Sequence, residues 1–302
     1  MEPRKKQLLR PLALMLAAVV PLSACKLYIP ETEGGSGEGD VSFFIQETPH
    51  QEQFGADLAI DGVELAIEAV ELERTDGEVV DVAVDVGTAF DLMPPNEVED
   101  PRVLQVFTDQ SLPDGEYRRL TLIIDTDESF VIPIGSSPAS LAAEDGAERL
   151  EFESSFSLDG ATELVLTVDL HAGLVEVNGG FELRPAHFIT RDVTSGLLRV
   201  RQRPSCPELG LYFYQGSNRD AAELGESGAP DFSLRPELGR SDVFMPYFPS
   251  GEYTVWYTCE ADQDSPDSTD GIEFEESENL NVEDGRCSQL EFGGGPGEPG
   301  TC

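Results

Sequence analysis

Two similar stretches of sequence decide the fold: Leu112-Pro113-Asp114-Gly115-Glu116-Tyr117 and Phe248-Pro249-Ser250-Gly251-Glu252-Tyr253. Each is an apolar residue followed by Pro-x-Gly-Glu-Tyr. The proline presets the φ angle of the first turn position and the glycine permits a positive φ two residues later, so the turn delivers the tyrosine into a new strand. The same turn in both parts of the chain predicts two units of one architecture.

The first unit, residues 41–195, contains short runs in which apolar and polar residues alternate. Gly, Pro and Asp residues separate these runs. Period-two alternation predicts strands with one buried face, and many such strands predict an antiparallel β-sandwich. Helix propensity alone would also allow a helix over 64–73, but the neighbouring runs favour a strand there. The expected strands are 63–67, 80–86, 117–124, 130–134, 150–156, 163–170, 174–177 and 187–190.

The second unit, residues 196–302, repeats this pattern. Its expected strands are 198–202, 211–214, 243–248, 253–259, 272–274 and 287–292. The sequence therefore predicts an all-β chain with two tandem antiparallel β-sandwich domains.

The first unit contains an ordered set of short pieces: Gly62-Val63-Glu64, Ala69-Val70-Glu71-Leu72, Phe90-Asp91-Leu92, residues 112–117, Leu164 to Asp169, and Leu183-Arg184-Pro185. In order and spacing this set resembles a known family, the bacterial domain of unknown function numbered 4382, and the resemblance implies a prealbumin-like fold without a known activity. The sequence departs from the family at Asp169-Leu170-His171, where the family usually has a second Asp in place of His171, and this departure weighs against an ion-binding role there. The second unit is similar to the cysteine-containing, immunoglobulin-like companion domain of such lipoproteins.

Residues 1–24 have the pattern of a signal peptide, with four basic residues before an apolar run at 11–20 that is too short to span a bilayer. The segment ends in Leu22-Ser23-Ala24-Cys25, which resembles the lipobox of bacterial lipoproteins. The resemblance implies that Cys25 is alkylated with diacylglycerol and becomes the first residue after cleavage. The alternative is a buried cysteine at the end of a helix.

A lipid on Cys25 predicts a protein that is tethered to a membrane through its N-terminus. Three acyl chains, at about 0.8 kcal/mol per buried methylene, hold far more strongly than one. In lipoprotein sorting as known in enteric bacteria, Asp after the cysteine retains the protein in the inner membrane, so Lys26 favours the outer membrane of a Gram-negative bacterium, on its periplasmic or its surface side. Residues 25–40 have the composition of a flexible linker with a reach of roughly 20 Å.

The other four cysteines form an even set in an exported chain, which predicts two disulfides. Three pairings are possible. We favour Cys206 with Cys259 and Cys287 with Cys302, because Cys206 and Cys259 border strand-like runs. A zinc site is the alternative, but no pair has the Cys-x-x-Cys spacing.

The charge of the chain excludes one large class of partners. It has 59 Asp and Glu against 19 Lys and Arg, a net charge of −40, which disfavours binding to nucleic acids. Among the bases after the signal peptide, every one except Lys26 is Arg. This composition is typical of proteins that work in concentrated salt, where screening weakens self-repulsion, and it predicts a halophilic or marine source. The alternative is that the acidity captures cations or basic partners.

The catalytic motifs that are easiest to recognise are absent from the sequence. The only histidines, His50, His171 and His187, lie in no His-Glu-x-x-His or Cys-His context, and the segment around Ser136 is better explained as a β-turn than as a nucleophile loop. Paired carboxylates for glycoside chemistry are too numerous to single out. We therefore expect no enzyme and no cofactor, with an envelope hydrolase, for example a carbohydrate-active one, as the alternative.

The densest acidic segment is residues 260–271, directly after Cys259. Its residues Asp262, Asp264, Asp267 and Asp270 are the candidate metal ligands, because hard oxygen ligands at alternating positions suit calcium. The EF-hand pattern fails at its glycine position, so a solvated hairpin loop is the favoured interpretation and a calcium-dependent adhesion module is the alternative.

Aromatic residues concentrate in the second unit, where they could line a groove or fill a sandwich core, and the core is the commoner use. The sequence as a whole predicts an envelope protein with a binding or structural role, whose partner would be a protein or a carbohydrate. The aromatic residues are Tyr212, Phe213, Tyr214, Tyr247, Phe248, Tyr253, Trp256 and Tyr257.

Overall fold

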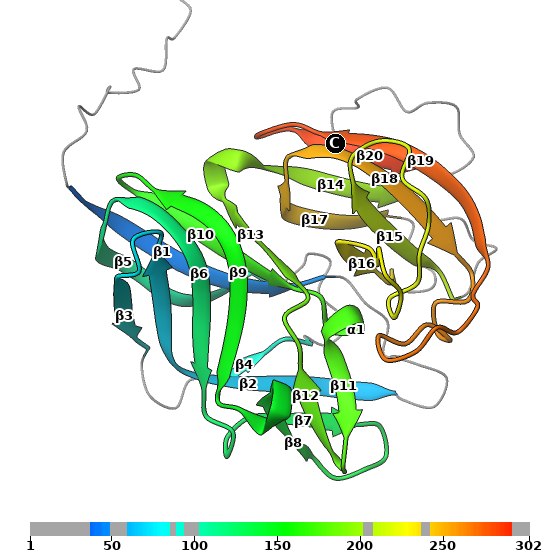
Figure 1. The fold of residues 1–302 in the computed structure, drawn as a ribbon, viewed down its shortest axis with the longest axis horizontal. Helices are drawn as coiled ribbons and strands as arrows, with labels where there is room; N and C mark the ends of the chain where they lie inside the picture. Colours follow the sequence, from blue (N-terminus) through cyan, green and yellow to red (C-terminus); the bar gives the residue numbers. More distant parts are fainter. Residues whose placement is uncertain are drawn as a thin grey trace, which may run out of the picture. The chain divides into compact units, whose positions relative to one another are not determined.

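The computed structural model describes residues 37–48, 59–84, 89–93, 103–201, 208–236 and 242–291. Over these ranges the regular secondary structure is almost entirely β-strand, as the sequence predicts (Figure 1). The helical elements are one four-residue α-helix and two 3₁₀ turns: α1 (Leu170–Gly173), η1 (Glu144–Gly146) and η2 (Asp192–Thr194). None of the helices in the described ranges has the length and hydropathy needed to cross a lipid bilayer.

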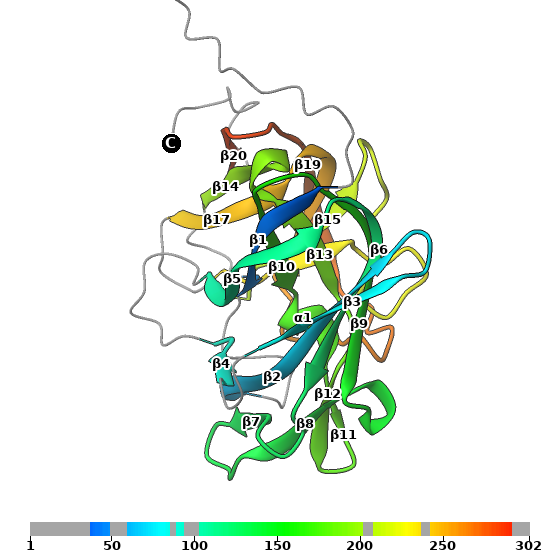
Figure 2. The same cartoon turned by 90° about the vertical axis from the view of Figure 1, so that its left-hand side faces the viewer.

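The first sandwich packs two sheets around one hydrophobic core. One sheet has the strand order β13-β10-β1-β5 (Figure 2), and the other has the order β11-β12-β8-β7-β2-β6-β9, with β3 and β4 also paired to β2. Apolar residues at alternate positions of both sheets are buried, which is the physical cause of the two layers. The strands are β1 (Glu38–Glu47), β2 (Ile60–Arg74), β3 (Val79–Ala83), β4 (Ala89–Asp91), β5 (Leu104–Pro113), β6 (Gly115–Ile124), β7 (Phe130–Pro133), β8 (Ala139–Ala143), β9 (Arg149–Leu158), β10 (Thr162–Val168), β11 (Leu174–Val177), β12 (Gly180–Leu183) and β13 (His187–Arg191).

The second sandwich has a three-stranded sheet, β17-β14-β20, and a four-stranded sheet, β16-β15-β18-β19. A second core lies between them. The strands are β14 (Ser195–Arg201), β15 (Gly210–Gln215), β16 (Phe232–Leu234), β17 (Asp242–Pro249), β18 (Gly251–Thr258), β19 (Phe274–Val282) and β20 (Cys287–Glu291).

The two sandwiches share a pattern of strand pairing and strand connections. In the first, β1 pairs with β5 in antiparallel and with β10 in parallel orientation, and in the second β14 pairs with β17 and β20 in the same two ways. The other sheets contain the matching orders β2-β6-β9 and β15-β18-β19. Each Pro-x-Gly-Glu-Tyr turn carries the chain from one sheet to the other, from β5 to β6 and from β17 to β18. The repeated turn therefore marks a repeated six-strand framework.

The two turns also share their hydrogen bonding. The hydroxyl of Tyr117 donates to the carbonyl oxygen of Pro113 at 2.7 Å, and that of Tyr253 donates to the carbonyl oxygen of Pro249 at 3.1 Å. Both glycines have a positive φ, 149° at Gly115 and 155° at the second turn, which a residue with a Cβ rarely adopts. Both tyrosines are buried. In each turn, a tyrosine from the strand that follows the turn is thus hydrogen-bonded back to the proline that precedes the glycine.

Among the described strands, three neighbouring pairs are parallel, whereas the sequence predicts antiparallel sheets. They are β1 with β10, β12 with β8, and β14 with β20. In each pair a long connection brings the chain back to the same sheet, where the later strand runs in the same direction as the earlier one. The stretch over 64–73 is a strand, inside the 15-residue β2.

The prediction of a strand at 272–274 is wrong, because the strand in this region is β19 and covers Phe274–Val282. Most of β19 is polar and exposed, with buried apolar residues only near its end, at Leu280 and Val282. Its pairing with β18 therefore makes the rest of the segment a strand. The expected strand at 163–170 ends at Val168, and Leu170 begins α1.

Contacts join the two sandwiches. The side-chain amide of Gln46 donates to the Pro246 carbonyl at 3.0 Å, and the Thr190 hydroxyl donates to the Tyr247 carbonyl at 3.0 Å. Phe188 of β13 packs against the second core. Residues 36–302 form one compact unit, so a boundary between independent domains at 195/196 stays a prediction.

Candidate functional site

The predicted cysteines lie partly outside the described residues. Cys25, Cys206 and Cys302 fall there, so lipidation and disulfide pairing stay predictions. Cys259 directly follows β18 and Cys287 begins β20, and both are disulfide-bonded.

The four predicted metal ligands lie in the loop between β18 and β19, but they do not converge on one point. Asp267 is exposed and forms an ion pair with Arg184, with 2.5 Å between Nη1 and Oδ1. Asp262 is half-buried and lies near the guanidinium of Arg235. The carboxylate group that the described residues bring together includes Asp264 and Asp270 but not Asp262 or Asp267, because loop packing and not sequence distance decides which carboxylates meet.

Two of the four residues do meet, together with a third carboxylate that sequence spacing did not indicate. One carboxylate oxygen each from Glu223, Asp264 and Asp270 lies within 4.8 Å of the others. We call these three residues the carboxylate cluster. Glu223 comes from the loop between β15 and β16, some 40 residues earlier in the chain, and no local motif distinguishes it.

The cluster is largely buried. Asp264 is 0% exposed and Glu223 is 5% exposed, while Asp270 is at the surface. The pKa of Asp264 is raised to about 6, mainly by burial and in smaller part by the charges of Glu223 and Asp270. The interpretation of residues 260–271 as a fully solvated loop is therefore wrong at Asp264, because the β15–β16 loop covers it.

Backbone donors hold the carboxylates in place. The Ile272 amide donates to Glu223 Oε1 at 2.9 Å, and the Asp270 amide donates to Glu223 Oε2 at 2.5 Å. The Leu224 amide lies 3.4 Å from both oxygens of Asp264. Each loop thus hydrogen-bonds the acids of the other, and the cluster joins the two loops.

Two further buried polar groups lie near the cluster, one in β15 and one directly after β16. Tyr212 of β15 is 0% exposed, and its hydroxyl faces Asp264 outside hydrogen-bond geometry. Arg235 is 1% exposed, and burial lowers the pKa of its guanidinium although Glu208, Asp262 and Asp264 lie near it. A hard cation could bind oxygens arranged in this way.

A second group of buried polar residues consists of Asp169, His171 and Ser233. Asp169 caps α1 and accepts from the Ala172 amide at 3.1 Å. Its Oδ2 accepts from the Ser233 amide at 2.5 Å and from the Ser233 hydroxyl at 2.9 Å, while His171 Nδ1 lies 3.1 Å from the same hydroxyl. In a catalytic triad the histidine lies between the acid and the serine. Here the serine lies between them, and all three residues are buried, so the arrangement ties β16 to α1.

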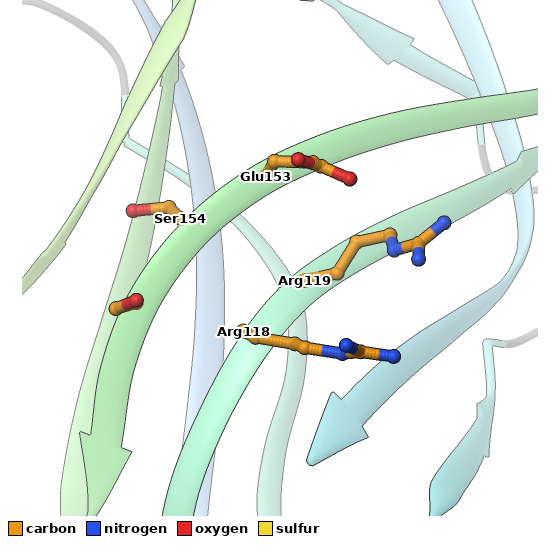
Figure 3. A pocket seen from close by; sticks show the side chains of 5 residues that line it. Arg118, Arg119, Glu153 and Ser154 are labelled. Atoms are coloured by element: carbon orange, nitrogen blue, oxygen red, sulfur yellow. The ribbon is translucent and has the colours of Figure 1, made fainter. Parts of the chain in front are cut away.

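A surface hollow of about 400 Å³ lies on the outer face of β6 and β9 (Figure 3). Arg118 and Arg119 line it, but both are ion-paired with Glu73, and Arg119 also pairs with Glu151 at 2.6 Å. Because the arginines are neutralised by these carboxylates, the hollow offers little net charge to a ligand. The other lining residues are Glu153, Ser154 and Ser155.

The aromatic residues of the second unit mainly fill cores, as the commoner interpretation holds. Phe213, Phe248 and Tyr253 belong to the core between the sheets. Tyr212 and Tyr214 form a smaller cluster beneath the β15–β16 loop, with Trp256 packed against it.

Comparison with known proteins places the chain in no family. No family model matches the sequence, and no curated protein matches it. The resemblance to family 4382 thus stays a prediction.

Three solved structures show distant similarity to the chain. They are the TIE protein of Bacillus anthracis (11% identity, 84% of this chain, TM-score 0.20), a candidate cell adhesion protein of Bacteroides fragilis (9% identity, 85% of this chain and 95% of that one, TM-score 0.19) and the fimbrial anchor protein Mfa2 of Porphyromonas gingivalis (13% identity, 74% of this chain and 80% of that one, TM-score 0.19). The chain spans a third of the length of the TIE protein. Similarity at this level shows neither a shared family nor a shared function.

Proposed function

We propose that this chain is a lipid-anchored protein of the bacterial cell envelope with a binding or structural role. The observation that carries the proposal is the lipobox-like end of the apolar N-terminal run, Leu22-Ser23-Ala24-Cys25. A thiol at that position, after an apolar run too short to span a bilayer, is the expected substrate of lipoprotein processing.

The place where the chain enters the fold supports a tethered role. The strand β1 begins at Glu38, inside the predicted linker 25–40, and it is an interior strand of its sheet, paired with β10 on one side and β5 on the other. Hydrogen bonds between strands are roughly perpendicular to the strand axis. A pull on the N-terminus along β1 therefore loads the bonds of both ladders together, rather than opening them one by one. This geometry suits a domain that is held by its N-terminus.

The use of polar residues supports binding or structure rather than catalysis. His171 is buried against Ser233, and the ring Nδ1 of His187 donates to the Pro185 carbonyl at 3.0 Å while burial lowers its pKa. These contacts stabilise the joint between the sandwiches and the segment that leads into β13. His50 lies outside the described residues.

Metabolic labelling tests the anchor. Cells expressing the chain are fed a fatty-acid analogue, and the tag is measured on the wild type, on Cys25→Ala and on the control Cys206→Ala. We expect a tag on the wild type and on Cys206→Ala, and none on Cys25→Ala. Equal tagging of Cys25→Ala would refute the proposal.

Membrane fractionation tests the destination. Lys26→Asp should move the protein from the outer-membrane to the inner-membrane fraction in a host with the enteric sorting system, because Asp after the lipidated cysteine acts as the retention signal there. An unchanged distribution would remove the argument for the outer membrane but leave the lipid anchor intact.

A further inference from the structure

We propose that Glu223, Asp264 and Asp270 bind a divalent cation of the calcium type, and that the ion fastens the β15–β16 loop to the β18–β19 loop. The three carboxylates come from two loops and converge to within 4.8 Å. Calcium prefers such oxygen ligands, carboxylates above all. The inference concerns this site alone and does not depend on the lipid anchor.

Tyr212 gives an observation that is independent of the acids. Its side chain is 0% exposed, and its hydroxyl has no hydrogen-bond partner while it faces Asp264. A buried hydroxyl without a partner is destabilising, because it has lost its hydrogen bonds to water and gained none in return. An ion held by Asp264, with the water molecules that calcium commonly retains, would provide a partner for this hydroxyl.

The charges around the cluster leave a negative excess. The guanidinium of Arg235 lies near Asp264, but it also lies near Asp262 and 3.6 Å from Glu208. One positive charge is thus shared among three acids, of which only Asp264 belongs to the cluster. Glu223 and Asp270 accept hydrogen bonds from backbone amides and one hydroxyl. Two of the three clustered carboxylates are buried, where like charges repel strongly. A divalent cation would offset that repulsion.

The loops approach each other closely enough to share an ion. A Cβ added to Gly225 would lie 2.0 Å from the Ser268 carbonyl oxygen, so the two backbones are in direct contact next to the acids. An ion at the cluster would therefore bridge segments that already touch, and would need little rearrangement to bind.

Terbium luminescence tests the site in the full-length protein. Tb³⁺ takes calcium sites and emits when a nearby aromatic side chain absorbs, and Tyr212 and Trp256 pack in one cluster beneath the loop. We expect sensitised emission that excess CaCl₂ removes. Glu223→Gln and Asp270→Asn should each weaken terbium binding by about tenfold or more, because each removes one charged ligand.

The matched control is Asp267→Asn, which removes the same charge from the same loop but outside the cluster. It should bind terbium as the wild type does, within about twofold. Asp270 is exposed, so its variant should fold even where Glu223→Gln does not.

A second measurement separates binding from general screening. The melting temperature should rise with millimolar CaCl₂ at constant ionic strength and fall again with chelator, and Glu223→Gln should abolish the rise. An absence of calcium-displaceable emission, or equal responses of the wild type and both cluster variants, would overturn the proposal and leave the acids as hydrogen-bond acceptors of the two loops.

Discussion

The tyrosine that closes the first repeated turn can be tested by removing a single oxygen atom. In Tyr117→Phe the ring keeps its stacking on Phe156, with centroids 5.5 Å apart, and its position under the guanidinium of Arg74. The change removes only the 2.7 Å hydrogen bond to the Pro113 carbonyl. That bond holds together the two ends of the turn that carries the chain between sheets.

The expected loss of stability follows from where the bond lies. Tyr117 is 0% exposed, whereas Pro113 is half-buried, so water can reach the orphaned carbonyl only in part. We expect the free energy of unfolding to fall by about 1–2 kcal/mol. For a folded unit of this size that corresponds to a melting temperature lower by about 2–8 °C.

Urea denaturation of the full-length protein in detergent, followed by circular dichroism, measures the change. The control is Tyr247→Phe, because that hydroxyl lies 3.5 Å from the exposed Glu163 and its loss should cost less than about 0.5 kcal/mol. If Tyr117→Phe were as stable as Tyr247→Phe, the turn would not depend on its hydrogen bond and our explanation of the repeated motif would be wrong.

The same experiment with Tyr253→Phe tests whether the sandwiches are separate domains. Trp256, the only tryptophan, lies in β18 of the second sandwich, so its fluorescence reports the unfolding of that part. If the sandwiches unfold independently, Tyr253→Phe should shift the fluorescence midpoint and Tyr117→Phe should leave it unchanged. Equal shifts from both variants would show that residues 36–302 unfold as one unit.

Three further predictions concern disulfides, salt and pH. Peptide mapping without reduction should find Cys206 bonded to Cys259 and Cys287 to Cys302; any other pairing would contradict the prediction, and a free thiol would contradict the count. Raising NaCl or KCl from 0.1 to 2 M should raise the melting temperature, because removing one acid and four bases with the signal peptide takes the net charge from −40 to −43 and salt shortens the Debye length from about 10 Å to about 3 Å at 1 M; a flat series would contradict salt adaptation. Burial raises the folded-state pKa of Asp169 to about 6 from its ordinary 3.8, so the stabilisation due to its protonated form should be complete below about pH 4 and lost as the pH rises through about 6. Asp169→Asn should flatten the dependence of unfolding free energy on pH across that window, and an unchanged slope would mean that the carboxyl is not buried as described.

Local patterns predicted a large part of this fold. The alternation in residues such as Val63, Leu65 and Ile67 placed strands correctly, because one buried face imposes a period of two on a strand wherever it pairs. The repeated turn indicated two similar units, because the φ preferences of proline and glycine act within a few residues. The all-β class follows from these local rules.

Tertiary structure alone decided the rest. Most of strand β19 is polar, and apolar alternation is confined to Leu280 and Val282 near its end, so its hydrogen bonds to β18 define the strand. The parallel pairing of β1 with β10 joins Val41 to Thr162, which no short-range preference encodes. Glu223 meets Asp264 and Asp270 for the same reason, since the packing of two loops sets the distance between their carboxylates. Spacing within one loop selected Asp262 and Asp267 together with Asp264 and Asp270 and did not indicate Glu223, because sequence distance measures proximity only until the chain folds back on itself.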